Sequence, residues 1–291
     1  VWIKDRGATY SHTLTDKVRG TSKELYANGT AAEVSYSQGV TSFDSDGFTI
    51  GANDNVTRNS ETLVAWCWKE SPTAGFDILT FTGNASGNQT ISHNLSAVPK
   101  WWNIKRLDQA SNWCTYHVGL GGADHNLFLN TTSASQTDTG IWNNTLPTST
   151  VFSTGAAGTT NDSGETYVAF CFTSIKGYSK FGSYVGDGSS DGTFTYTGFK
   201  PAYVMIKSFS NSGDYWFICD NKRDIDNPVT AGIRADTDNN ENTGLFAVDF
   251  LSNGFKAVDS GGQNVSGRDY IYMAFAEHPF VSSEGVPVTA R

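Results

Sequence analysis

Charged side chains are scarce in this sequence, and positive ones form no cluster along it. Only 17% of the 291 residues are Asp, Glu, Lys or Arg, and the formal net charge is −9. A protein that binds nucleic acid by counterion release needs a basic face, so nucleic acid is not an expected partner. Long apolar runs are missing as well, and none approaches the roughly 20 residues of a membrane-spanning helix. We therefore expect no membrane span.

Motifs of the common catalytic sites are also missing. The sequence contains no phosphate loop and no Gly-x-Gly-x-x-Gly fingerprint, and its five histidines are scattered. The glutamates that recur in equivalent places are Glu61 and Glu165, and Arg268 stands at the third such place. A glycosidase needs two carboxyl groups that face each other across a cleft, and no pair of this kind recurs. The sequence predicts a protein that is not an enzyme.

Helix signals are missing, and cysteines are few. No amphipathic pattern runs longer than two helical turns, whereas 30 glycines and many Ser, Thr and Asn residues punctuate short apolar stretches. That composition is typical of many short strands joined by turns. Of the four cysteines, only Cys114 and Cys171 could bridge within one repeated unit. Buried free thiols and assembly in a reducing compartment are therefore expected.

What the chain does contain is one short stretch that occurs three times. The copies are Ser60–Trp68, Ser163–Phe172 and Ser266–Phe275. When Ala65, Ala169 and Ala274 are placed in register, the copies lie 104 and 105 residues apart. An Ile-Lys pair recurs with nearly the same period, beginning at Ile3, Ile104 and Ile206. The sequence therefore predicts three tandem copies of a unit of about 100 residues.

The repeated stretch has the pattern of a strand that is covered on both faces. In the first copy one face carries Leu63, Ala65 and Cys67, and the other carries Val64, Trp66 and Trp68. Both faces are apolar, whereas a strand with one solvated face alternates apolar and polar residues. Such a strand has to lie between two layers.

These patterns predict an all-β fold of three antiparallel β-sandwiches in tandem, either jelly-roll or immunoglobulin-like. The expected units are residues 1–72, 73–174 and 175–278, followed by an extended tail at residues 279–291. Asp46-Gly47 and Asn253-Gly254 lie between apolar residues and predict β-hairpins. The Cys…Trp…Cys framework of immunoglobulin domains is missing, which favours the jelly roll.

The first unit lacks a segment that the other two have. An opener precedes the Ile-Lys strand at residues 76–99 in the second unit and at residues 178–201 in the third, and the first unit has none. A sheet that lacks a strand exposes unpaired N–H and C=O groups. We therefore predict a subunit contact at Val1, Trp2 and Ile3, with the alternative that the sequence is part of a longer protein.

Two polar regions could bind a ligand. Trp142 and Asn143 lie in a polar connection, and an exposed Trp beside an amide is typical of a site that stacks on a sugar. Asp236, Asp238 and Glu241 offer several oxygen ligands within a few residues, as calcium requires. Clusters of this composition are also ordinary turn material, so a turn remains the alternative to a calcium site.

Several motifs together resemble those of one family of viral proteins. They are Gln89–Leu95 with Val98-Pro99, Ile104–Arg106, Leu127–Asn130, Trp142–Phe152, Ser163–Phe170 and the ending Tyr270–Phe280. This set is similar to the tandem unit of structural proteins from tailed phages of marine bacteria, and the resemblance covers nearly the whole chain. It implies a concanavalin-like sandwich in a fibre, spike or decoration component.

The resemblance also implies partners and a location. It implies a virion protein, assembled in the host cytoplasm and exposed on the particle surface, that contacts other virion proteins, itself as a homo-oligomer such as a trimer, and a host-surface glycan. A non-enzymatic structural role that contributes to attachment is the main expectation. A carbohydrate-binding, lectin-like module is the alternative, and a glycoside hydrolase is a less favoured one.

Overall fold

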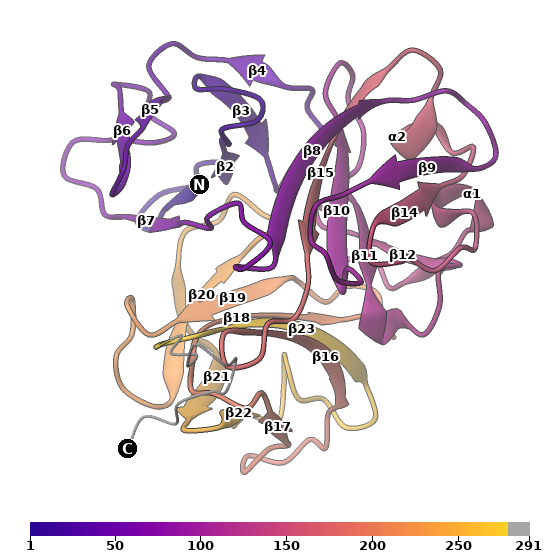
Figure 1. Ribbon diagram of the computed structural model, residues 1–291. Coiled ribbons are helices and arrows are strands. Elements are labelled where there is room, and N and C mark those ends of the chain that lie inside the picture. Colours follow the sequence, from indigo (N-terminus) through magenta and orange to yellow (C-terminus); the bar gives the residue numbers. More distant parts are fainter. Residues whose placement is uncertain (279–291) are drawn as a thin grey trace.

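The computed structural model describes residues 1–278, which form an all-β structure (Figure 1). Its strands pair antiparallel, and the helices among these residues are single turns: η1 (Val118–Leu120), α1 (Thr139–Trp142) and α2 (Gly158–Asn161). The prediction of an antiparallel all-β fold without long helices is therefore confirmed. None of these helices has the length and apolar character needed to traverse a bilayer. The tail predicted at residues 279–291 lies outside the described residues.

Residues 1–72, the first segment, form a five-stranded sheet and a separate hairpin. The sheet has the order β4-β3-β2-β1-β7, and the hairpin consists of β5 and β6. The strands are β1 (Trp2–Asp5), β2 (Thr13–Leu14), β3 (Lys23–Tyr26), β4 (Val34–Ser35), β5 (Val40–Phe43), β6 (Phe48–Ile50) and β7 (Leu63–Trp66). The hairpin turns at Asp46-Gly47 as predicted, and the Asp44 N–H donates to the Gly47 carbonyl oxygen at 2.8 Å.

Residues 73–174, the second segment, form a six-stranded sheet faced by a two-stranded one. The orders are β13-β12-β11-β10-β15-β8 and β14-β9. The strands are β8 (Phe76–Thr82), β9 (Gln89–Ser92), β10 (Trp101–Arg106), β11 (Cys114–His117), β12 (His125–Phe128), β13 (Gln136–Thr137), β14 (Val151–Thr154) and β15 (Thr166–Phe172). Side chains from both sheets pack together in one outer cluster, so this segment is a β-sandwich.

Residues 175–278, the third segment, form one eight-stranded sheet of the order β16-β23-β18-β19-β20-β21-β22-β17. The strands are β16 (Ser179–Val185), β17 (Phe194–Tyr196), β18 (Pro201–Ser208), β19 (Phe217–Asp220), β20 (Val229–Arg234), β21 (Asn242–Leu251), β22 (Gly254–Ala257) and β23 (Asp269–Ala276). The two edge strands are consecutive in the chain, so the sheet curls until it is nearly closed. β21 and β22 form the hairpin predicted at Asn253-Gly254.

The three sheets meet at a common core in the middle of the molecule (Figure 1). This central cluster takes aromatic and aliphatic side chains from every segment, among them Trp2, Trp66, Trp101, Phe170, Trp216 and Met273. Further clusters cover the outer faces of the second and third sheets. Both of these sheets are therefore buried on their two faces.

Alternation along β15 and β23 bears out the prediction of a strand covered on both faces. In β15, Val168 and Phe170 point into the central cluster, and Ala169 and Cys171 point into the outer one. β23 alternates in the same way between the central cluster and its own outer cluster. β7 departs from the prediction, because Ala65 is exposed on its outer side.

The cysteines follow the same division. All four are free; Cys114, Cys171 and Cys219 are buried, and Cys67 is exposed. The prediction of buried free thiols is confirmed for three of them and wrong for Cys67, which directly follows β7. The outer side of β7 is covered at Leu63, which packs against the small cluster of Ile3, Val40 and Val56, but it is open at Ala65 and Cys67.

Strand pairing corrects the register that the sequence suggested for the third copy. Ile3 lies opposite Ala65 and Ile104 lies opposite Ala169, but Ile206 lies opposite Tyr272. Tyr272, and not Ala274, is thus the residue equivalent to the two alanines. A shift of two residues leaves every side chain on its original face, so the pattern of apolar faces was insensitive to it.

Three equivalent backbone hydrogen bonds join the segments into a closed ring. The Glu33 N–H donates to the Leu107 carbonyl oxygen at 2.8 Å, the Ser135 N–H to that of Phe209 at 2.8 Å, and the Glu241 N–H to that of Arg6 at 2.9 Å. The first bond links segment one to two, the second two to three, and the third three to one. No segment is a free end of this ring.

Two of three buried lysines reinforce these junctions, and the third, Lys4, donates to the Asp5 and Ala8 carbonyl oxygens of its own segment. Lys4, Lys105 and Lys207 follow the recurrent Ile and are fully buried. Lys105 Nζ donates to the Thr30 carbonyl oxygen of segment one at 3.2 Å, and Lys207 Nζ donates to the Thr132 carbonyl oxygen of segment two at 3.3 Å. Burial lowers the pKa of each ammonium to about 8. Carbonyl partners are what permit such burial, because an ammonium without them is costly to desolvate.

Candidate functional site

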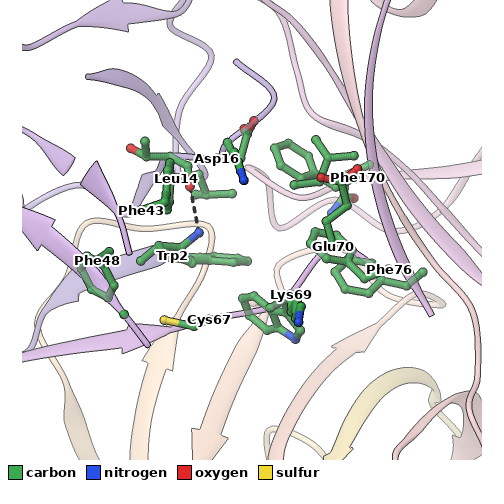
Figure 2. A pocket seen from close by; sticks show the side chains of 18 of the residues that line it. Trp2, Leu14, Asp16, Phe43, Phe48, Cys67, Lys69, Glu70, Phe76 and Phe170 are labelled. Carbon is green, nitrogen blue, oxygen red and sulfur yellow. Dashed lines mark hydrogen bonds between the residues drawn. The ribbon is translucent and has the colours of Figure 1, made fainter. Parts of the chain in front are cut away.

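A cavity of about 780 Å³ lies where the first and second segments meet the central cluster (Figure 2). Its walls are mainly apolar and come from all three segments. They include Trp2, Leu14, Trp68, Phe76, Phe170 and Met205. Phe43 and Phe48 of the β5–β6 hairpin close the side opposite Phe76 and Phe170 (Figure 2). A cavity of this size and character would accept an apolar group of considerable volume.

Charged side chains surround the mouth of the cavity. Asp16 is held by Arg19, whose Nε donates to Asp16 Oδ2 at 2.5 Å. Arg19 also donates to Glu33 at 3.0 Å. Lys69 and Glu70 line the other side and are largely exposed. Partial desolvation, followed by the charge of Asp77, raises the pKa of the Glu70 carboxyl. The mouth therefore carries both signs of charge, and its buried carboxylate, Asp16, is already paired with Arg19.

The ion pair at Asp16 has a counterpart in the third segment. Arg223 Nε donates to Asp220 Oδ2 at 2.7 Å, and Arg223 also donates to Glu241 at 2.7 Å. The similar strand endings Asp16–Arg19 and Asp220–Arg223 thus make the same set of bonds. At the junction of segments one and three, however, Trp66 Nε1 donates to Asp220 Oδ2 at 3.0 Å. Within residues 1–278 Asp16 accepts from no aromatic donor of this kind, and it lines the cavity instead.

The place of the cavity corresponds to a buried tryptophan of the second sheet. In the second sheet β10 contains two further residue pairs at this end, the last with Trp101 opposite both Phe172 and His117. The residues equivalent to these two partners in the first segment are Trp68 and Asp16, and both line the cavity. The cavity therefore lies where the second segment places a buried tryptophan. The sequence shows that the first segment lacks an opener, but it does not show where this cavity lies. The strands that an opener pairs with are decided only by the fold.

Trp142 is fully buried, so the exposed sugar-stacking position predicted for it is wrong. It ends the single-turn helix α1, which Asp138 caps by accepting from the Gly140 N–H at 2.8 Å. The helix turns Trp142 into the outer cluster of the second segment, where its ring meets that of Trp102 at 5.2 Å. Asn143 follows in a left-handed conformation and donates to Thr145 Oγ1 at 3.3 Å. The polar neighbours in the sequence belong to the turn and do not expose the ring.

Asp236, Asp238 and Glu241 do not form a calcium site in the structure. Asp236 is buried and accepts from the Trp216 N–H at 3.1 Å, and burial raises the pKa of its carboxyl to about 6. Glu241 accepts from Arg6 and Arg223, and these bonds outweigh burial and lower its pKa. Asp238 is exposed. Among residues 1–278 no three His, Cys, Asp or Glu side chains are grouped so that they could hold a metal ion.

Val1, Trp2 and Ile3 are not the open edge that the sequence analysis predicted. β1 is paired on both sides, with β2 and β7, and Trp2 and Ile3 are buried. The physical reason is that the openers of the other segments pair with β15 and β23 and not with β10 or β18. Among residues 1–278 no opener strand pairs with β7, so β7 lies at an edge of its sheet.

The buried histidines are engaged in structure. His12 Nε2 lies 3.0 Å from the Arg234 carbonyl oxygen, and His117 Nε2 lies 3.1 Å from that of Tyr272.

The Gly-x-Ser-x-Gly pattern of serine hydrolases occurs at residues 188–192. It lies in the loop between β16 and β17, where no helix follows. A nucleophile elbow requires a strand-turn-helix, so this match has the wrong context.

These features define an all-β protein whose sheets meet at a central cluster, with an apolar cavity beside that cluster. The chain belongs to the family described as domain of unknown function (DUF7483), whose family model matches residues 1–279. No match was found among curated proteins or among solved structures.

Proposed function

We propose that the chain is a non-enzymatic structural module of a virus particle, as part of a tail fibre or spike or of a capsid fibre or decoration. The observation that carries the proposal is the ring of backbone bonds between the segments. It links Glu33 to Leu107, Ser135 to Phe209 and Glu241 to Arg6. A block closed in this way resists local opening, as a load-carrying surface component requires.

The internal arrangement supports a common origin of the three segments. We propose that they are three copies of one sandwich unit, related to the jelly-roll and concanavalin-like folds. Equivalent side chains support this: Trp113 Nε1 donates to the Tyr26 carbonyl oxygen at 2.9 Å, and Trp216 Nε1 donates to that of Phe128 at 3.0 Å. In the first copy, His12 takes this place toward Arg234.

The partners proposed are other virion proteins and further copies of the chain, as in a homo-oligomer, and the location is the surface of a particle assembled in the host cytoplasm. The test is to purify particles and label them with a gold-conjugated antibody against the chain. Labels at regular positions on tails or capsids would support the proposal. Recovery of the chain only in the particle-free fraction would refute it.

A carbohydrate-binding role is the second candidate, and one observation favours it. Phe194 and Tyr196 are 45% and 58% exposed and lie two residues apart on the edge strand β17, so their rings share one face. Lys180 Nζ lies 5.0 Å from the centroid of the Tyr196 ring. Exposed rings beside a donor are a common surface for stacking on a sugar.

A glycan array tests this second role. Binding that is lost with Tyr196→Ala and retained with Trp142→Phe would support it, because Trp142 is buried. An array without signal would remove it. A glycoside hydrolase is less favoured, since Asp16, the buried carboxylate at the cavity, is already bonded to Arg19 and is poorly placed to transfer a proton.

A further inference from the structure

β7 has one free edge, whereas its counterparts have none. β15 pairs with β10 and β8, and β23 pairs with β18 and β16. β7 pairs with β1, and no other strand within residues 1–278 pairs with it. A free edge presents a ladder of backbone donors and acceptors that another strand can join.

The register shows which backbone groups are free. The Arg6 N–H donates to the Thr62 carbonyl oxygen at 2.8 Å, and Val64 and Trp66 lie opposite residues of β1. In an antiparallel pair every second residue bonds to the neighbour, so Ala65 and Cys67 direct their N–H and C=O groups away from β1. In β15 the equivalent groups face β8, where Ala169 lies opposite Leu79.

A second free edge belongs to the β5–β6 hairpin. Its counterpart strand β22 pairs with β17, and β14 of the second segment pairs with β9. β6 pairs with β5 alone among the described strands. β8 and β9 are consecutive in the chain, as are β16 and β17. One strand–loop–strand segment therefore covers both positions in each of the other two segments.

The cavity adds a third feature to the two edges. It is lined by Phe48 of β6, by Cys67 beyond β7 and by Trp68 and Asp16. The residues equivalent to Trp68 and Asp16 enclose Trp101 in the second sheet and Tyr203 in the third. An aromatic side chain that ends an opener would thus enter this cavity and occupy part of its volume.

We propose that the β7 edge, the β6 edge and the cavity form one acceptor site for an opener-type polypeptide segment from outside residues 1–291. Its chemistry is that of residues 76–101 and 178–203. It comprises an extended strand with alternating apolar residues and little net charge, a Gly- and Ser-containing loop, a short second strand and a final aromatic residue that enters the cavity. This inference rests on strand pairing and does not depend on a role in virus particles.

Cys67 provides a built-in reporter for the test, because it is the exposed cysteine beside β7 and the other three are buried. The whole chain is labelled with a maleimide at fixed pH, with and without a synthetic peptide of residues 76–101. We expect the peptide to slow labelling of Cys67 at least tenfold in a saturable manner. A scrambled peptide of the same composition should leave the rate unchanged.

Ala65→Pro is the blocking variant. Proline is tolerated on an edge strand where its missing N–H faces away from the partner, and the Ala65 N–H faces the free edge. The variant should keep the circular dichroism of the parent and lose protection by the peptide. Hydrogen exchange at the Ala65 and Cys67 amides of the unmodified chain gives a second readout, in which the peptide should slow exchange at both.

Three outcomes would overturn the proposal. The first is unchanged labelling and exchange at saturating peptide. The second is protection of Cys67 without peptide in a dimer seen by sedimentation, which would assign the site to a second copy of the chain. The third is equal protection by a small apolar dye that Ala65→Pro does not affect, which would make the cavity an ordinary apolar pocket.

Discussion

His117 joins the second sheet to the third through its Nε2, which lies 3.1 Å from the carbonyl oxygen of Tyr272. Its other nitrogen, Nδ1, accepts from the Gly119 N–H at 2.9 Å. His12 is bonded in the same sense, because Nε2 lies 3.0 Å from the Arg234 carbonyl oxygen and Nδ1 accepts from Trp2 Nε1 at 2.8 Å. A neutral imidazole satisfies both contacts, whereas a second proton would set an N–H against an N–H.

Acid should therefore weaken the junctions between segments. Burial, joined by the Lys4 charge at His12, lowers the pKa of His12 and of His117 to about 3. The unfolded chain, with a pKa near ~6.5, then binds more protons than the folded one below that pH. Stability should be lost as pH falls from about 6.5 toward 3, by about 1.4 kcal/mol per pH unit for each histidine. Urea unfolding between pH 7.5 and 4.5 measures this slope.

The matched variant for this prediction is the double change His12→Gln and His117→Gln. The slope of its unfolding free energy against pH should be smaller in the same range, corresponding to nearly two fewer protons taken up on unfolding. Identical slopes for the two proteins would show that these histidines do not govern acid stability.

Asp236→Asn should stabilise the protein at neutral pH. The equivalent residues are Asn28 and Asn130, whose Oδ1 atoms accept from the His12 and Trp113 N–H groups as Asp236 accepts from that of Trp216. Because the folded-state pKa of Asp236 is raised to about 6, the folded chain binds more protons between pH ~3.8 and 6. Stability is lost as pH rises through that window and stays lost above it.

We expect a gain of about 1–2 kcal/mol at pH 7.5 that shrinks toward pH 4, as measured by thermal unfolding. Asn130→Asp is the reverse change and should lower stability at pH 7.5. A gain that is equal at both pH values would mean that the carboxylate charge is not its source.

Lys105→Met should weaken the contact between the first and second segments. The side chain donates to the carbonyl oxygens of Thr30 and Arg106, and a buried acceptor left without a donor costs about 1–3 kcal/mol. Since the folded pKa lies near 8 and the unfolded one near ~10.4, the parent gains stability between these values. The variant should therefore fall further below the parent in unfolding free energy at pH 10 than at pH 7.5. Exposed Lys176→Met is the control and should change the urea midpoint little.

Glu241→Gln should destabilise the fold without any calcium effect. It leaves Arg6 and Arg223 without their shared carboxylate, and breaking a buried ion pair from one side costs about 3–5 kcal/mol. Partial exposure of Arg6 places this case at the lower end. Asp238 is exposed, so Asp238→Asn should leave the stability unchanged. Millimolar calcium should not shift the melting temperature of the parent or of either variant. A calcium-dependent rise in the melting temperature of the parent that both variants lose would support the predicted calcium site.

Much of the fold could be predicted because its signals are local. Alternation in Ser163–Phe172 predicted a strand buried on both faces, and the pairs Asp46-Gly47 and Asn253-Gly254 predicted their hairpins. The likeness of Asp16–Arg19 to Asp220–Arg223 predicted one feature in two places, and both make the same ion pairs. Such patterns depend on side-chain periodicity and turn conformation, which a few adjacent residues determine.

Tertiary structure alone decided which residues are covered and which are open. The polar sequence around Trp142 suggested exposure, but a single helical turn places its ring in the core. The acidic residue Glu241 suggested a metal ligand, but it accepts a hydrogen bond from Arg6, which lies 235 positions away in the sequence. The missing opener was visible in the sequence, but only the pairing of β8 with β15 showed that β7, and not β1, carries the free edge. Sequence by itself determined the strands and their two faces, whereas contacts between distant segments, which no local pattern encodes, determined the neighbours of each face.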